Sequence, residues 1–130
     1  MLVSPLIAAD VAATVARGRW REPRVLVDPA AGEQTDAGPV PNAKVLRRLM
    51  RRVVTDGSGS AAEAVPGPPV RGKTGTAEYG NDDPPRTHAW FIGFQDDLAF
   101  AVLVAETADS YGGRVAAPIA AEFLTALRAR

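Results

Sequence analysis

The sequence predicts an α+β fold, in which an antiparallel sheet of about three strands is flanked by helices. The stretch HAWFIGF at 88–94 and the apolar run LAFAVLVAE at 98–106 have the composition of paired strands, and the polar residues between them suit a hairpin turn. Segments with apolar residues at helical spacing lie on either side of these runs. We expect strands at about 70–78, 88–95 and 98–106, and helices at about 4–17, 43–55 and 115–128.

The composition bounds the function. The 130 residues suffice for one small domain or for part of a larger one. Fifteen basic residues balance fifteen acidic ones, so no overall charge favours nucleic acid or an anionic membrane. The absence of Cys excludes thiol catalysis and thiolate metal sites, and no apolar run reaches the ~20 residues of a membrane span. The first segment lacks a basic n-region and is interrupted by Asp10, which argues against a signal peptide.

The first helix has a clear start and end. Ser4 suits the N-cap, Pro5 the first helical position and Gly18 the residue after the last turn. Its expected apolar face consists of Ile7, Val11 and Val15. The following residues, 19–41, are rich in Pro and Gly and predict a loop with one short strand at Arg24-Val25-Leu26-Val27. The role of Trp20 in this loop stays open.

The second helix is strongly amphipathic. Asn42 is expected to cap it and Gly57 to end it. The expected buried stripe consists of Val45, Leu46, Leu49, Met50, Val53 and Val54. Arg47, Arg48, Arg51 and Arg52 lie on the opposite face, which we interpret as a solvated surface in preference to a docking patch for phosphates or an acidic partner.

The strand at 98–106 is apolar on both sides and therefore needs cover on both faces of the sheet. The last helix could supply one cover through Ile119, Phe123 and Leu127, and Pro118 is tolerable there only near the first turn. We expect the cover of the other face to be missing from this chain, and the exposed apolar surface to cause self-association.

The segment Lys73-Thr74-Gly75-Thr76, within PPVRGKTGTAEYG, carries the strongest chemical signal. A strand edge binds an extended peptide by main-chain hydrogen bonds, and Gly75 lets a substrate backbone approach closely. Thr74 and Thr76 offer hydroxyls to a carboxylate, and Lys73 supplies positive charge. By alternation Lys73 and Gly75 share one face of the strand, and the two threonines share the other. Taken alone, the same four residues also suit an ordinary edge strand with a solubilising lysine.

A nucleophile motif is absent. A K-T-G strand is one of three elements of the penicillin-binding and serine β-lactamase active site, and the other two are S-x-x-K and S-x-N. None of the four serines, at positions 4, 58, 60 and 110, has Lys three residues later or Asn two residues later. The chain therefore holds one wall of such a site without its attacking group.

The order of the motifs resembles one family over roughly residues 2–128. GKTGTAE, a polar loop, HAWFIGF, a hairpin, AVLVAE and YGGRVAAPIAAEF are similar to the C-terminal part of class B penicillin-binding proteins, the D,D-transpeptidases of peptidoglycan synthesis. Upstream, VSPLIAADVAATVARGRWREPRVL resembles the helix that follows the S-x-N region of that family, and LRRLMRRVVTDGSGSAA resembles the helix and turn before its K-T-G strand. The expected fold is then an incomplete part of a penicillin-binding transpeptidase fold.

The resemblance implies roles for individual residues. Lys73 would hold the electrostatics and proton network of the site, Thr74 and Thr76 would bind the carboxylate of a stem peptide or β-lactam, and Gly75 would lie at the substrate backbone. The Thr76 N–H would be one oxyanion donor; the second donor of the family, the N–H of the nucleophilic serine, has no counterpart here. The isolated chain is therefore expected not to acylate. The resemblance implies no cofactor, and it places the complete family protein at the extracytoplasmic face of the plasma membrane.

Other candidate residues give weaker evidence of a functional site. His88 is the single histidine, and without a nucleophile in reach we interpret it as structural rather than as a general base. The acidic pairs Asp82-Asp83 and Asp96-Asp97 suit turns better than a metal site, because adjacent residues face different ways.

Two alternatives to a transpeptidase fragment remain. One is a non-catalytic module, or a half-domain that pairs with a separate chain carrying S-x-x-K. The other is the C-terminal part of a serine β-lactamase or β-lactam sensor, which the segments SPLIAADVAATVARG and YGGRVAAPIA disfavour.

Overall fold

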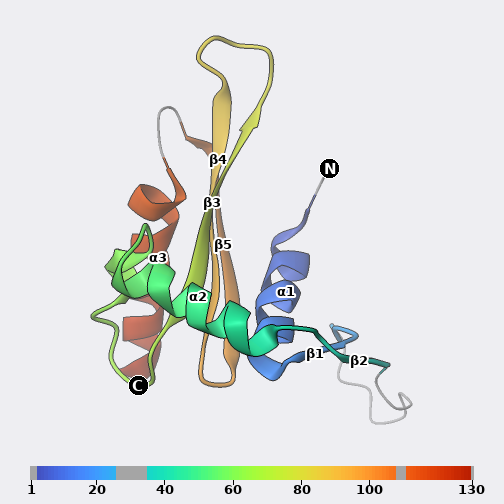
Figure 1. Cartoon of the computed structure of the whole chain (residues 1–130). Helices are drawn as coiled ribbons and strands as arrows, with labels where there is room; N and C mark the ends of the chain where they lie inside the picture. Colours follow the sequence, from blue (N-terminus) through green and yellow to red (C-terminus); the bar gives the residue numbers. More distant parts are fainter. Residues whose placement is uncertain (1–2, 26–34, 108–110, 130) are drawn as a thin grey trace.

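The computed structural model describes residues 3–25, 35–107 and 111–129, and it shows three helices, a short 3₁₀ turn and two antiparallel sheets (Figure 1). This arrangement confirms the α+β class expected from the sequence. The elements are α1 (Pro5–Arg17), β1 (Arg19–Arg21), β2 (Asp36–Pro39), α2 (Ala43–Thr55), η1 (Ser60–Ala62), β3 (Arg71–Tyr79), β4 (Arg86–Gln95), β5 (Leu98–Thr107) and α3 (Gly112–Arg128).

The larger sheet has the order β3-β4-β5, and both of its connections are hairpins. The β4–β5 turn consists of Asp96 and Asp97, and Asp96 takes the left-handed conformation that a tight turn requires, with φ 57°. The β3–β4 hairpin is longer and extends beyond the helices (Figure 1). In the loop of this hairpin Asp82 forms an ion pair with Arg86 at 3.0 Å. The acidic residues Asp82 and Asp83 therefore belong to a turn, as Asp96 and Asp97 do.

Helices lie on both sides of this sheet (Figure 1). Helix α3 covers one face, α1 covers part of the opposite face, and α2 packs beside β3. The main core lies between the sheet, α3 and the turn after α2, and its largest fully buried side chains are Phe91, Leu124, Val54 and Val70. A smaller cluster, made of Ala12, Val15, Met50 and Phe94, joins α1 and α2 to the other face.

The buried faces of α1 and α3 consist largely of alanines, and of the six large apolar residues expected on them only Val15 is buried. In α3 the buried residues include Ala116, Ala117, Ala120 and Leu124, whereas Ile119, Phe123 and Leu127 are exposed. In α1, Ala8, Ala12 and Val15 are buried, whereas Ile7 and Val11 are half exposed. Alanine faces let each helix approach the sheet closely, which turns the larger side chains away from it.

Pro118 also lies deeper in α3 than expected. The helix begins at Gly112, three residues before the expected start, so Pro118 is inside it rather than at the first turn. Because proline has no N–H, the carbonyl of Arg114 loses its helical partner there.

Helix α2 buries only part of its expected stripe. Met50 and Val54 are buried and Val53 is partly buried, whereas Val45, Leu46 and Leu49 are exposed. Asn42 has φ 59° and makes no side-chain cap, contrary to expectation; its carbonyl accepts hydrogen bonds from the Val45 and Leu46 amides.

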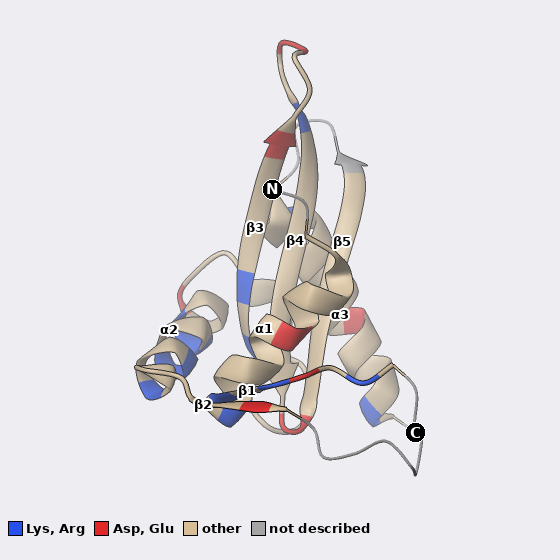
Figure 2. Ribbon diagram, turned by 90° about the vertical axis from the view of Figure 1, so that its right-hand side faces the viewer, with Lys and Arg blue, Asp and Glu red and all other residues tan. Residues whose placement is uncertain are grey.

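The arginines of α2 are not all solvated, although Figure 2 shows them as a row of basic bands along this helix. Arg47 donates to the carbonyl of Ala16 at 2.9 Å, and Arg51 donates to the carbonyl of Val70 at 3.0 Å. The first bond ties α2 to the end of α1, and the second ties it to the segment that enters β3. The preference for a fully solvated face is therefore corrected at these two positions.

A two-stranded ribbon follows α1, which begins at the Ser4 cap and ends at Gly18 as expected. Its strands are β1 and β2, so the short strand lies at 19–21 and not at 24–27, where Arg24 and Val25 are outside any strand and Leu26 and Val27 lie outside the described residues. Trp20 donates its indole N–H to Asp10 at 2.8 Å, which answers the open question of its role: it anchors the ribbon to α1.

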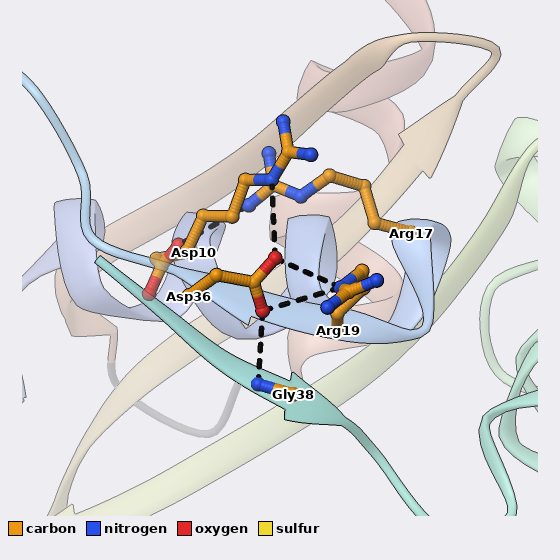
Figure 3. Close-up of polar contacts among 6 residues, drawn as sticks. Asp10, Arg17, Arg19, Asp36 and Gly38 are labelled. Atoms are coloured by element: carbon orange, nitrogen blue, oxygen red, sulfur yellow. Dashed lines mark hydrogen bonds and ion pairs between the residues drawn. The ribbon is translucent and has the colours of Figure 1, made fainter. Parts of the chain in front are cut away.

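Asp36 organises this ribbon (Figure 3). Its carboxylate accepts the Gly38 N–H at 2.9 Å and a hydrogen bond from Arg19. The Gly38 N–H, followed by Arg19 and Arg21, lowers the pKa of Asp36 below its usual value, because each stabilises the charged form.

Candidate functional site

The K-T-G-T segment lies on β3, an edge strand of the larger sheet. β3 pairs with β4 alone, so its other edge carries main-chain groups that no strand among the described residues satisfies. The register places Lys73 opposite Ile92, Gly75 opposite Trp90 and Thr76 opposite Ala89. An extended peptide can add to such an edge as a further strand.

Alternation along β3 separates the Lys73 side chain from those of the two threonines, as the pleat of the strand requires. Thr74 and Thr76 face the side of α3, where their hydroxyls contact Ser58 and Gly112. Lys73 faces the side of α1 and α2, and its ammonium donates to the Thr74 carbonyl at 2.6 Å. Gly75 has a packing reason as well as a chemical one, because a Cβ there would meet the Cβ of Trp90 at 3.3 Å.

A polar cavity of about 670 Å³ lies beside this strand. It is lined by Lys73, Thr74, Gly75 and Thr76, by Ser58 and Ser60 from the turn after α2, and by Tyr111, Gly112, Gly113 and Arg114 at the start of α3. Residues with hydroxyl groups, main-chain groups and the cationic residues Lys73 and Arg114 thus border one space, which suits a carboxylate with an extended backbone.

Two apolar cavities lie on the opposite face and meet at Lys73 and Ile92. One, of about 480 Å³, lies between α1 and the sheet and is lined mainly by Val3, Ala8, Trp90 and Leu103. The other, of about 620 Å³, lies between α1 and α2 and is lined mainly by Val11, Leu46, Leu49 and Val53. We call the two together the α1–α2 groove. Most of their lining residues are apolar, whereas residues with hydroxyl groups gather at the polar cavity, so we place the candidate ligand site there.

Ser58 and Gly112 are site residues that the sequence analysis missed. The Oγ atoms of Ser58 and Thr74 lie 2.5 Å apart, and the Gly112 N–H donates to Thr76 Oγ1 at 3.3 Å. Both contacts join segments far apart in the chain, which periodicity cannot reveal. The adjacent glycines were the available signal: a Cβ on Gly112 would overlap the carbonyl oxygens of Trp90 and Gly75, and one on Gly113 would overlap the carbonyl of Ser58.

His88 lies away from the polar cavity. Its half-buried ring packs on the ring of Tyr79, with centroids 4.2 Å apart. The Arg86 guanidinium lies over the Tyr79 ring, 5.0 Å from its centroid. Within the described residues, none of the hydroxyls that line the polar cavity is hydrogen-bonded to His88 or to the Lys73 ammonium. The described part of the site therefore offers positioned hydroxyl and main-chain donors but no activated nucleophile.

The described residues contain no group of three His, Asp or Glu side chains placed to hold a metal ion. None of the helices in the described ranges combines the length and apolarity needed to cross a membrane.

Comparison with known proteins identifies the family. The model of the penicillin-binding protein transpeptidase domain matches residues 1–125. The peptidoglycan D,D-transpeptidase PbpA of Mycobacterium tuberculosis is 35% identical over 139 residues, which covers 90% of this chain and 28% of PbpA. Penicillin-binding protein 1A of Neisseria lactamica is 30% identical over 89 residues, which covers 64% of this chain and 10% of that protein.

Solved structures agree with the sequence matches. The TP domain of penicillin-binding protein 3 from Burkholderia pseudomallei superimposes with a TM-score of 0.71 at 28% identity, covering 93% of this chain and 40% of that one. The D,D-transpeptidase domain of a peptidoglycan glycosyltransferase from Eggerthella lenta gives a TM-score of 0.64 at 29% identity, covering 93% of this chain and 31% of that one. The chain thus spans less than a third of the length of its curated relatives and well under half of these solved chains. It belongs to the penicillin-binding protein transpeptidase domain family.

Proposed function

We propose that this chain forms the substrate-binding wall of a D,D-transpeptidase site that cross-links peptidoglycan by serine acyl transfer. The observation that carries the proposal is the free edge of β3, which presents Lys73 to Thr76 to a cavity lined by hydroxyls and cationic side chains. A peptide that ends in a carboxylate would bind along this edge, and a β-lactam would bind there as its mimic. Such substrates lie at the extracytoplasmic face of the plasma membrane, where we expect the complete protein to act.

Each site residue takes one role in this proposal. The hydroxyls of Thr74 and Thr76 bind the substrate carboxylate, and Lys73 provides positive charge and a proton path near the attacking group. Gly75 leaves room for the substrate backbone. The Thr76 N–H donates to the oxyanion that develops during acyl transfer.

The nucleophile must come from residues outside this sequence. An S-x-x-K serine would attack the substrate carbonyl, form an acyl-enzyme with loss of the terminal D-Ala, and pass the acyl group to an acceptor amine. Loss of one oxyanion donor alone typically costs ~10²–10³ in rate. Because this chain lacks the attacking group as well, we expect it to be inactive alone.

The α1–α2 groove supports the proposal that this chain forms only part of the catalytic site. Leu46, Leu49 and Val11 line it and are exposed, next to the face of β3 that carries Lys73. Apolar side chains gathered in one groove usually contact another protein segment. The same groove is the observation that favours the second candidate, a half-domain that pairs with a separate chain carrying S-x-x-K.

Intact-mass analysis after incubation with benzylpenicillin tests the proposal. We expect the folded chain to keep its unmodified mass. The matched control is the urea-unfolded chain, which reports non-specific acylation of lysines. A stoichiometric adduct on one serine or threonine, formed in the folded chain and absent from the unfolded one, would show a complete site. It would contradict the claim that this chain lacks a nucleophile.

A further inference from the structure

We infer that Ser58 and the Gly112 amide are positioning groups for the Thr74 and Thr76 hydroxyls. Both contact the threonines from the side of α3. The Gly112 N–H occupies an acceptor site on Thr76 Oγ1, and Ser58 does the same on Thr74 Oγ1 when its hydroxyl is the donor. The two hydroxyl hydrogens are then free to point into the polar cavity at the β3 edge. The inference rests on the proposed function for the identity of the ligand, a carboxylate.

The Gly112 contact defines its own direction. A main-chain N–H can only donate, so Thr76 Oγ1 is the acceptor of the 3.3 Å hydrogen bond. A threonine hydroxyl has one hydrogen and two acceptor sites. The bond from Gly112 uses one acceptor site and leaves the Thr76 hydrogen available for a ligand in the cavity that Thr76 lines.

The Ser58 contact can run either way, and the ligand decides between the two directions. Ser58 and Thr74 are 2.5 Å apart, and either hydroxyl can be the donor. If Thr74 donates, its single hydrogen is committed to Ser58. If Ser58 donates, both threonine hydrogens are available, and a hydrogen bond to a charged carboxylate is roughly twice as strong as one between neutral groups. Carboxylate binding therefore selects Ser58 as the donor.

The main chain around these two groups is closely packed. The Gly59 N–H donates to the Val53 carbonyl at 2.8 Å, which holds the turn that carries Ser58 against the end of α2. Gly113 approaches the Ser58 carbonyl so closely that a Cβ on Gly113 would overlap it. The start of α3 and the turn that carries Ser58 thus pack against each other beside β3. The main chain therefore fixes the positions of the Ser58–Thr74 and Gly112–Thr76 contacts.

Nuclear magnetic resonance on the isotope-labelled chain tests the inference with Ser58→Ala and Ser58→Thr. Side-chain couplings report the Thr74 χ1 rotamer without ligand, and the Thr74 to Thr76 amide shifts report the Kd of benzylpenicillin and of its methyl ester. We expect Ser58→Ala to let the Thr74 rotamer average and to weaken binding of the acid about three- to tenfold, the value of one hydrogen bond. The ester, which lacks the carboxylate, should be unaffected. Ser58→Thr keeps a hydroxyl and should restore both readouts. Thr125→Ala, which removes an exposed hydroxyl from the far end of α3, is the control.

Three outcomes separate the inference from the function on which it rests. A Thr74 rotamer that stays fixed in Ser58→Ala would overturn the positioning role. Equal weakening of the acid and the ester would show that Ser58 acts on general packing, which would also overturn it. Absence of penicillin binding to the wild-type chain would refute the proposed function, and the rotamer readout alone would then decide whether Ser58 orients Thr74.

Discussion

Gln95 is the most consequential polar residue of the core, and its replacement by Met tests how the segment before β3 is held. The side chain is fully buried at the end of β4. Its amide donates to the carbonyls of Pro66 and Pro68, each at 2.8 Å, and its oxygen accepts a hydrogen bond from Arg128 at 3.3 Å. One amide thus joins the sheet, the loop that leads into β3 and the last turn of α3.

The loss of stability in Gln95→Met follows from these three bonds. Each contributes about 0.5–1.5 kcal/mol net, and Met has a similar length without the amide group. Pro66 and Pro68 are exposed, so water can reach part of their carbonyl surface after the substitution. The apolar surface that the Met side chain buries offsets a further part of the lost stability. We therefore expect a loss in the lower half of the combined range, about 2 kcal/mol.

Urea denaturation followed by tryptophan fluorescence measures this loss. With a slope of about 1–3 kcal/mol/M, a change of about 2 kcal/mol lowers the midpoint by about 1 M. Arg128→Met is the matched control, because it removes only the bond accepted by Gln95 and should shift the midpoint much less. A Gln95→Met midpoint equal to that of the wild type would show that the two loop carbonyls need no protein donor, and the reasoning would be wrong.

Three further predictions concern other parts of the fold. The pKa of Asp36 is lowered in the folded state, so the charged carboxylate stabilises the fold at pH values above the unfolded pKa of about 3.9, and this stabilisation is lost as pH falls through the folded pKa. Titration followed by ¹³C resonances should show the lowered pKa, and Asp36→Asn should flatten the acid dependence of amide exchange in β1 and β2. Gly112→Ala should destabilise the chain by about 1–3 kcal/mol in urea through overlap with main-chain carbonyls, less the ~1 kcal/mol that alanine gains in a helix; unchanged stability would contradict the close approach. Leu49→Ser should reduce concentration-dependent association in gel filtration, whereas identical monomeric elution of both chains at every concentration would argue against an adhesive groove.

Local patterns predicted the three helices and the three-stranded sheet, but not the ribbon of β1 and β2. The β4–β5 hairpin follows from two apolar runs separated by a short acidic turn, and α1 follows from the Ser4-Pro5 start and the Gly18 end. These signals depend on residues close together in sequence, where backbone preferences act directly. The order of the motifs also indicated the family correctly, because the K-T-G strand kept its expected neighbours along the chain.

Buried faces could not be predicted in the same way. Phe123 and Ala120 are both apolar, and the helical pattern alone favoured the larger residue as the one that contacts the sheet. The structure buries Ala120 and Leu124 and leaves Phe123 half exposed, so the buried face of α3 follows from how the helix lies on the sheet and not from the size of each apolar residue. Ser58 and Gln95 were missed for a related reason: their partners are 16 to 33 residues away, and no local pattern records such contacts.

The two faces of β3 differ in what this chain supplies to them. On the α3 side, Thr74 and Thr76 already have their supporting contacts from Ser58 and Gly112, and a cavity is open beside them. On the other side, Lys73 faces the apolar α1–α2 groove, which the described residues leave open. The exposed Lys73 ammonium already donates to the Thr74 carbonyl at 2.6 Å. An ammonium group has three hydrogens, so it can also donate to a further group. We therefore expect a segment that completes the site to cover the apolar side chains of the groove and to bring a polar group to the Lys73 ammonium.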